Sequence, residues 1–202
     1  MSTRKKRDTS RKRAEILDAA VQAFREHGFD NTSMDRIAEV AGASKRTVYN
    51  HFESKEVLFE AVMEDFHRKA RELKEIPYDP DAELAPQLGA FVDVKLKMLA
   101  DPEWGGLVRV GLGVLIREPA FAQRAMERAE ADHNTLVEWL RGADADGRLR
   151  VEDARTSAAL FWSTVAGAFF WPTIMGAPPK PAVARRLKEA LIESFLTSHA
   201  PH

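Results

Sequence analysis

The chain of 202 residues contains no cysteine, which excludes disulfide bonds, thiolate nucleophiles and metal sites held by cysteine. No apolar segment follows its N-terminal charges, so the pattern of a secretory signal peptide is missing. Gly-x-Ser-x-Gly, His-Glu-x-x-His and P-loop motifs are also absent. These absences favour a cytoplasmic protein that holds no cofactor and is not an enzyme.

Long hydrophobic runs are scarce as well. The stretch from Thr156 to Pro179 carries no charge, but Pro172 leaves only 16 residues ahead of it. A bilayer core requires about 20 apolar residues in a helix. We therefore expect a helix buried by protein in this region, and no membrane among the partners.

No segment alternates between polar and apolar residues for long enough to predict a strand, whereas apolar residues repeat at helical spacing almost throughout. The sequence therefore predicts an all-α fold of nine helices. The first ends at Gly28, and the others span about residues 33–41, 44–52, 54–76, 81–100, 102–118, 119–142, 151–171 and 181–198.

Charge is distributed unevenly, although the formal net charge is −1. Residues 1–55 carry 12 Lys and Arg against 8 Asp and Glu. Residues 1–13 form a basic arm, a composition suited to phosphate backbones or anionic membrane surfaces. Its cations are Arg4, Lys5, Lys6, Arg7, Arg11, Lys12 and Arg13. We expect this arm to enter a minor groove of DNA or to lie along phosphates.

Residues 33–55 carry the most informative pattern: two short helices joined by a turn at Gly42, which is helix-turn-helix spacing. A major groove about 12 Å wide admits one helix, and Lys, Arg and Asn side chains can bond base edges there. The start of a helix, as at Ser33, also offers free amide groups to a phosphate. The candidate DNA-binding residues are Ser33, Ser44, Lys45, Arg46, Thr47, Tyr49, Asn50, His51 and Lys55.

The run TSMDRIAEVAGASKRTVYNHFESKEVLF, residues 32–59, resembles the DNA-binding signature of TetR-type transcriptional regulators. The resemblance implies an N-terminal three-helix headpiece and a C-terminal domain for ligand binding and dimerisation. The expected divisions are the arm 1–13, the DNA-binding domain 14–55 and the second domain 56–202. By the same resemblance, Lys45, Arg46, Thr47 and Asn50 approach bases, and Tyr49, His51 and Lys55 hold the backbone.

The resemblance further implies a ligand-responsive regulator, expected to be a repressor, that binds a palindromic operator as a homodimer. A small hydrophobic or aromatic effector would release it. Candidate ligand-binding residues are Phe66, Phe91, Trp104, Leu112, Trp139 and Phe161. Candidate dimerisation residues, which repeat every four positions in two helices, are Ala159, Ser163, Gly167, Leu187, Leu191 and Phe195. Glycines of the sixth helix, such as Gly111, suggest an element whose conformation a ligand could select.

Two other readings stay open at this point. A nucleoid or division factor could use the same fold to bind DNA without sensing a small molecule. A di-metal helical-bundle enzyme could use the Glu-x-x-His pairs at Glu64–His67 and Glu130–His133. Such a site needs a Glu from each of two further helices, and both histidines lie in strongly charged surroundings, so we expect no metal.

Overall fold

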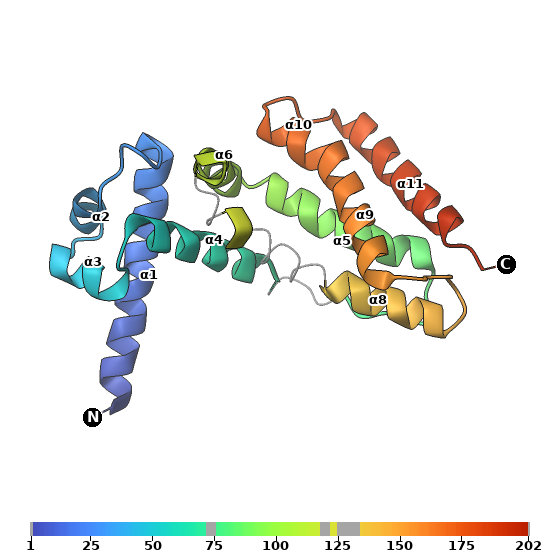
Figure 1. The fold of residues 1–202 in the computed structure, drawn as a ribbon, viewed down its shortest axis with the longest axis horizontal. Coiled ribbons are helices and arrows are strands. Elements are labelled where there is room, and N and C mark those ends of the chain that lie inside the picture. The colour runs from blue at the N-terminus through green and yellow to red at the C-terminus, as the bar shows by residue number, and fades with distance from the viewer. Residues whose placement is uncertain (1, 72–75, 118–121, 125–133, 202) are drawn as a thin grey trace. The chain divides into compact units, whose positions relative to one another are not determined.

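The computed structural model describes residues 2–71, 76–117, 122–124 and 134–201, and it describes side chains within these ranges except for residues 2–9, 66–71 and 117. Helices are the regular elements of this described part, which confirms the all-α class (Figure 1). None of the helices described is both long and apolar enough to cross a bilayer. The chain packs as two compact units.

The first unit comprises Met1–Ala70 and Pro102–Arg117. Its helices are α1 (Ser2–His27), α2 (Met34–Val40), α3 (Lys45–His51), α4 (Lys55–Arg71) and α6 (Pro102–Arg117). Figure 1 shows α2 and α3 beside the long α1. Residues 1–13 were expected to form a separate arm, but the backbone is helical from Ser2 and continues α1. No Gly or Pro interrupts it before Gly28, and Lys and Arg are good helix formers.

Helix α6 packs on α1 and α4 although it is distant from them in sequence. Its Glu103 pairs with Arg25 of α1 at 3.0 Å. A Cβ atom on Gly111 would lie 3.3 Å from the ring of Phe59 in α4. Gly111 therefore permits a close approach between two helices, so its presence has a packing reason that the sequence pattern does not reveal.

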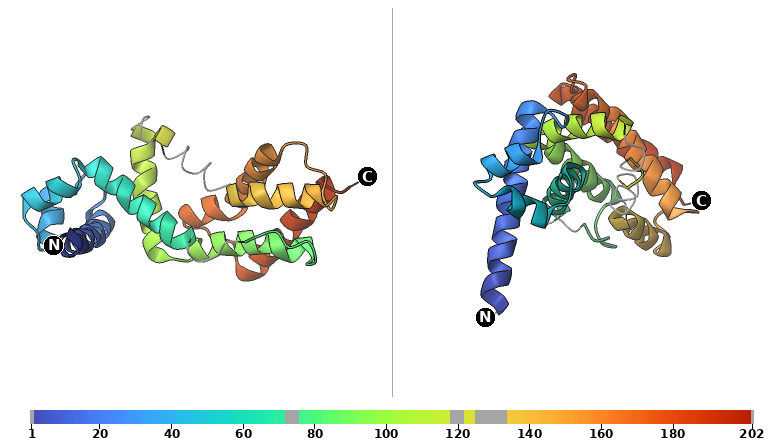
Figure 2. Two further views of the ribbon diagram at one scale, coloured as in Figure 1. Left: turned by 90° about the horizontal axis from the view of Figure 1, so that it is seen from below. Right: turned by 60° about the vertical axis from the view of Figure 1, so that its left-hand side comes forward.

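The second unit comprises Arg71–Asp101 and Glu118–His202. Its described elements are α5 (Leu84–Leu99), α8 (Asn134–Ala145), α9 (Ala154–Val165), the π-helical η1 (Ala166–Phe170), α10 (Trp171–Ile174) and α11 (Pro181–Ser198). Helices α5, α8, α9 and α11 surround one hydrophobic cluster, which includes Phe91, Trp139 and Phe161 (Figure 2).

Two of the expected helix boundaries in this unit need correction. Helix α5 begins at Leu84 rather than near Asp81, because Arg148 and Gln87 bind the carbonyl groups of Asp79, Pro80, Ala82 and Glu83. Helix α8 passes Gly142 and ends at Ala145, and the left-handed residue after it is Gly147, at φ +66°. The start of the expected helix 119–142 lies outside the described residues.

The expected helix 151–171 also differs from the observed one. Helical structure continues through η1 to Ile174, past Pro172. The Trp171 amide donates to the carbonyl of Ala166, five residues back, which makes a wider turn than in an α-helix. The next residue, Pro172, has no amide hydrogen to donate. The other expected stops at Gly28 and Gly42 are confirmed by positive φ angles of 76° and 53°.

We expect Gly142→Ala to destabilise the protein although alanine is the better helix former. The added Cβ atom would lie 2.7 Å from the Tyr78 ring, which Asp146 fixes by a hydrogen bond and Trp139 by an edge-to-face contact. Overpacking costs about 1–3 kcal/mol, whereas the gain in helix propensity is about 1 kcal/mol. Urea denaturation measures the net loss.

Gly105→Ala is the matched control, because its Cβ would meet only the end of the Arg109 side chain, at 3.8 Å. This variant should be neutral or more stable than the wild type. A Gly142→Ala protein that gained as much stability as Gly105→Ala would show that the Tyr78 ring moves aside without cost.

Candidate nucleic-acid interface

The turn between α2 and α3 is fixed by caps at both helices. Ser33 caps α2 by accepting the amide of Arg36, and Ser44 caps α3 by accepting the amide of Thr47, each at 3.1 Å. Thr32, the residue before the Ser33 cap, is buried, and its hydroxyl donates to the Gly28 carbonyl at 2.6 Å.

The inner faces of these helices are apolar. Ile37 of α2 and Val48 of α3 are fully buried, as is Ile16 of α1, and Phe52 is 3% exposed. Burying each such side chain stabilises the fold by about 1.5–3 kcal/mol. This packing orients α3 so that its remaining side chains face away from the protein.

The outward face of α3 carries the residues that the sequence predicted for base contacts. Lys45, Arg46 and Asn50 are exposed, and Tyr49 is 51% exposed. The amide and guanidinium groups of Asn50 and Arg46 make no hydrogen bond or ion pair within the described part of the chain. Both groups are therefore available to bond an adenine or guanine edge.

The other predicted residues of this face have partners within the protein. The Thr47 hydroxyl lies 2.8 Å from the Ser44 hydroxyl, and the half-buried His51 ring lies beside Phe52. The ammonium group of Lys45 pairs with the carboxylate of Asp35 on α2. This last contact was not expected from the sequence.

Lys55 has a structural role within the protein that the sequence did not predict. Its ammonium group donates to the carbonyls of Phe29 at 2.7 Å and Asp30 at 3.3 Å. It also lies 4.3 Å from the centre of the Phe29 ring, a cation–π contact. Lys55 thus ties the start of α4 to the turn that follows α1. A phosphate bound by Lys55 would compete with these groups for the ammonium charge.

Two cations of α1, which the sequence predicted only as part of the basic arm, contact the helix-turn-helix from within the protein. Lys12 donates to the Ala41 carbonyl, at the end of α2, at 3.2 Å and to Glu15 at 2.9 Å. The hydrogen bond from Lys12 lowers the pKa of Glu15. Arg13 lies over the Phe52 ring, at 5.2 Å. Helix α1 therefore contacts the C-terminal ends of both α2 and α3.

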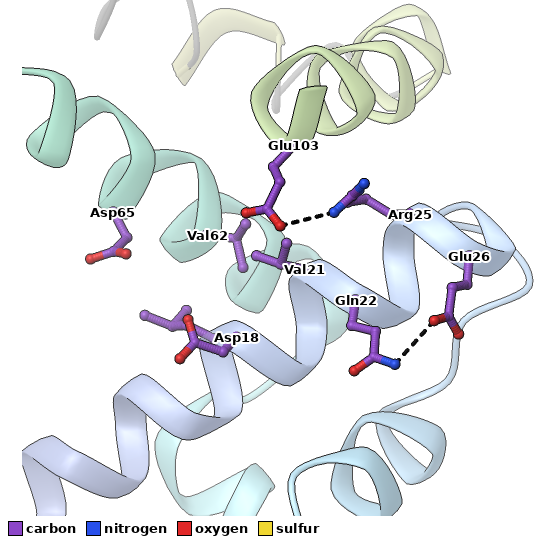
Figure 3. A pocket seen from close by; sticks show the side chains of 9 residues that line it. Asp18, Val21, Gln22, Arg25, Glu26, Val62, Asp65 and Glu103 are labelled. Atoms are coloured by element: carbon purple, nitrogen blue, oxygen red, sulfur yellow. Dashed lines mark hydrogen bonds and ion pairs between the residues drawn. The ribbon is translucent and has the colours of Figure 1, made fainter. Parts of the chain in front are cut away.

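A groove in the same unit lies between α1, α4 and α6 and has a volume of about 640 Å³ (Figure 3). Figure 3 shows Arg25 and Glu103 pointing toward each other beside it. Among its described lining residues, acidic side chains outnumber cations: Asp18, Glu26, Asp65 and Glu103 against Arg25. Such a lining repels phosphates, so the groove does not extend the nucleic-acid interface.

The candidate ligand-binding residues fall in different places. Phe91, Trp139 and Phe161 are at most 4% exposed and pack in the core of the second unit. Trp104 and Leu112 belong to α6 in the first unit. The side chain of Phe66 lies outside the described residues. The structure thus brings three of these six residues into one cluster.

The candidate dimerisation residues also separate. Ala159, Ser163 and Gly167 are exposed, and Leu187 is 37% exposed. Leu191 and Phe195 instead contact the core of their own unit. A row with four-residue spacing rotates by about 40° at each step because a helix has 3.6 residues per turn. The row on α11 therefore turns from the surface into the core.

The described residues contain no cluster of three or more His, Asp or Glu that could hold a metal ion. Of the two Glu-x-x-His pairs, Glu64 is exposed, and the side chains of His67, Glu130 and His133 lie outside the described residues.

Comparisons with known proteins agree with the helix-turn-helix geometry. Residues 16–62 match the model "Bacterial regulatory proteins, tetR family", and residues 86–200 match "AefR-like transcriptional repressor, C-terminal domain". The HTH-type transcriptional repressor AcnR of Corynebacterium diphtheriae is 30% identical over 147 residues, which cover 71% of this chain and 70% of the relative.

Solved structures give the same result. A TetR family transcriptional regulator from Pseudomonas syringae pv. tomato shares 34% identity at a TM-score of 0.76, covering 93% of this chain and 96% of that one. The Flavonoid-responsive Regulator FrrA shares 30% identity at a TM-score of 0.80, covering 96% and 99%. The resemblance seen in the sequence is confirmed: the chain belongs to the TetR family of helix-turn-helix transcriptional regulators and is not an enzyme.

Proposed function

We propose that this regulator is a repressor that binds a palindromic operator as a homodimer, inserts α3 of each protomer into a major groove and is released by a small hydrophobic or aromatic effector. The observation that carries the proposal is the row of exposed donors on a capped and rigidly packed α3. The name of the relative AcnR, a transcriptional repressor, supports the direction of regulation.

Within this proposal, the α3 residues Lys45, Arg46, Thr47 and Asn50 contact bases. Tyr49, His51 and Lys55 contact the phosphate backbone, and the backbone amides at the helix starts beside Ser33 and Ser44 donate hydrogen bonds to phosphate oxygens. The basic residues 1–13 extend the contact to neighbouring DNA. Residues 14–55 form the reading domain, and residues 56–202 contain the sensor and the dimer contact.

The dimer contact is supported by the distribution of exposed apolar side chains. Eight large hydrophobic residues are exposed in the described part of the chain, and five of them follow one another from α9 to α11. We infer that these five residues, Leu160, Trp171, Met175, Val183 and Leu187, contribute to one surface, which we name the apolar face. The exposed small residues Ala159, Ser163 and Gly167 of α9 and η1 would allow a partner helix to approach closely.

The class of effector is supported by the aromatic core of the second unit. Phe91 contacts the rings of both Trp139 and Trp162 edge to face, with centroids 6.3 Å apart in each pair. An aromatic molecule would find the same type of contact there. The relative FrrA is flavonoid-responsive by name, which is consistent with an aromatic effector.

The DNA-binding part of the proposal predicts a loss of operator affinity for two variants of α3. Arg46→Ala and Asn50→Ala should each weaken binding to the operator about 5- to 100-fold, the range for losing one good base contact. The operator is the duplex that the wild-type protein selects from a random library, and binding is measured by fluorescence anisotropy in competition with random duplex.

Arg155→Ala is the control, because it removes an exposed cation from the second unit without touching α3. Its operator affinity should equal that of the wild type. A wild-type protein that selects no sequence, or an Asn50→Ala variant with unchanged affinity, would contradict the proposed reading mode.

A further inference from the structure

One acidic side chain lies on the reading side of the helix-turn-helix. Asp35 is in the first turn of α2, and its carboxylate pairs with the ammonium group of Lys45, the first residue of α3. The two side chains are 52% and 67% exposed. The pair therefore joins the two helices at the surface where the proposed DNA contact begins.

Folding does not account for this pair. Exposed ion pairs contribute little to stability because water screens them and two long side chains must be ordered. Caps at Ser33 and Ser44 already fix both helices. A carboxylate on a surface that meets phosphates is also repelled by them, which lowers affinity for any duplex.

The chemistry of the pair nevertheless suits one kind of contact. It presents a hydrogen-bond donor and an acceptor side by side. A phosphate offers only acceptors, so it satisfies Lys45 and repels Asp35. The edge of a base pair in the major groove offers an acceptor and an amino donor next to each other, as guanine O6 and cytosine N4 do.

We propose that Asp35 is a specificity-determining residue, which holds Lys45 back from phosphates and directs the pair toward a base edge. This inference rests on the proposed function and adds a residue to it. Asp35 raises specificity in this proposal because it weakens contacts to phosphates more than the contact to the base edge.

The test compares Asp35→Asn with the wild type on the selected operator and on random duplex, over a series of salt concentrations. Freeing Lys45 to bind a phosphate should steepen the slope of log K against log[salt] on random duplex by about 0.9. Affinity for random duplex should rise, and the ratio of operator to random affinity should fall about tenfold.

Glu39→Gln is the matched control, because Glu39 also lies on α2, is exposed and pairs with a cation, Arg36. It removes the same charge and should leave the affinity ratio and the salt slope unchanged. Equal changes in both variants would overturn the inference, since they would reflect net charge alone.

A double-mutant cycle with Lys45→Ala separates the pair from its members. In the background of Lys45→Ala, adding Asp35→Asn should no longer steepen the salt slope. If the slope steepens by the same amount without Lys45, the inference is wrong. A failure of the proposed function looks different, because the wild type itself would then select no operator.

Discussion

Replacing Trp139 by alanine is expected to lower the free energy of unfolding by about 3–5 kcal/mol, the usual cost of removing a fully buried tryptophan. Trp139 is 1% exposed, and its ring meets Tyr78 and Phe91 edge to face. Its indole nitrogen donates to Gln87 at 3.0 Å. Its loss thus opens a cavity and releases the residue that organises the segment before α5.

One further variant separates the loss of the indole donor from the loss of the ring, and a second serves as a control. Trp139→Phe keeps an aromatic ring but loses the donor, and it should cost less than the alanine variant. Glu138→Ala, beside it on α8, removes an exposed side chain paired only with Arg141 among the contacts described, and should change stability by less than about 0.5 kcal/mol. Equilibrium urea denaturation followed by circular dichroism measures all three. A loss below 1 kcal/mol for Trp139→Ala would mean that the second unit repacks around the gap.

Leu160→Glu is expected to raise the dissociation constant of the proposed dimer at least about 100-fold. Leu160 is 63% exposed in the single chain and lies on the apolar face. A carboxylate buried there without a partner costs about 3 kcal/mol or more. Two-fold symmetry places the change on both protomers and so doubles it. Sedimentation velocity measures the association, and operator binding should fall in parallel because each protomer reads one half-site.

Ile116→Glu provides the comparison, because Ile116 is the most exposed of the large hydrophobic residues described, at 83%, yet belongs to α6 of the first unit and not to the apolar face. This variant should associate like the wild type. If Leu160→Glu also remained a dimer, helices α9 and α11 would not form the contact, and the proposed interface would be wrong.

The sequence predicted the helix-turn-helix well because its determinants are local. Ser44 and Gly42 act within a few residues of their own position, and Val48 follows from helical periodicity. Local signals of this kind can be read without knowing the fold. The same holds for α11, whose start at Pro181 is set by the proline itself.

Contacts between distant segments could not be predicted in the same way. Lys55 appears in the sequence as a surface cation, but the carbonyl it binds at Phe29 is 26 positions away. Gly142 appears as a helix stop, but it is a small residue required by Tyr78. Leu191 repeats like a dimer residue, but helical rotation turns it into its own core. In each case the partner is fixed only by the tertiary fold.

The close fit between Gly111 and Phe59 has a practical consequence for engineering chimeric regulators. The DNA-reading part of the chain is not a continuous segment, because α6 packs with it after an interval of about thirty residues. A graft that exchanges only the first seventy residues with those of a relative would set a foreign side chain against Gly111. Hybrids should therefore take α6 and the helices that it contacts from the same parent protein, so that the packed surfaces still match.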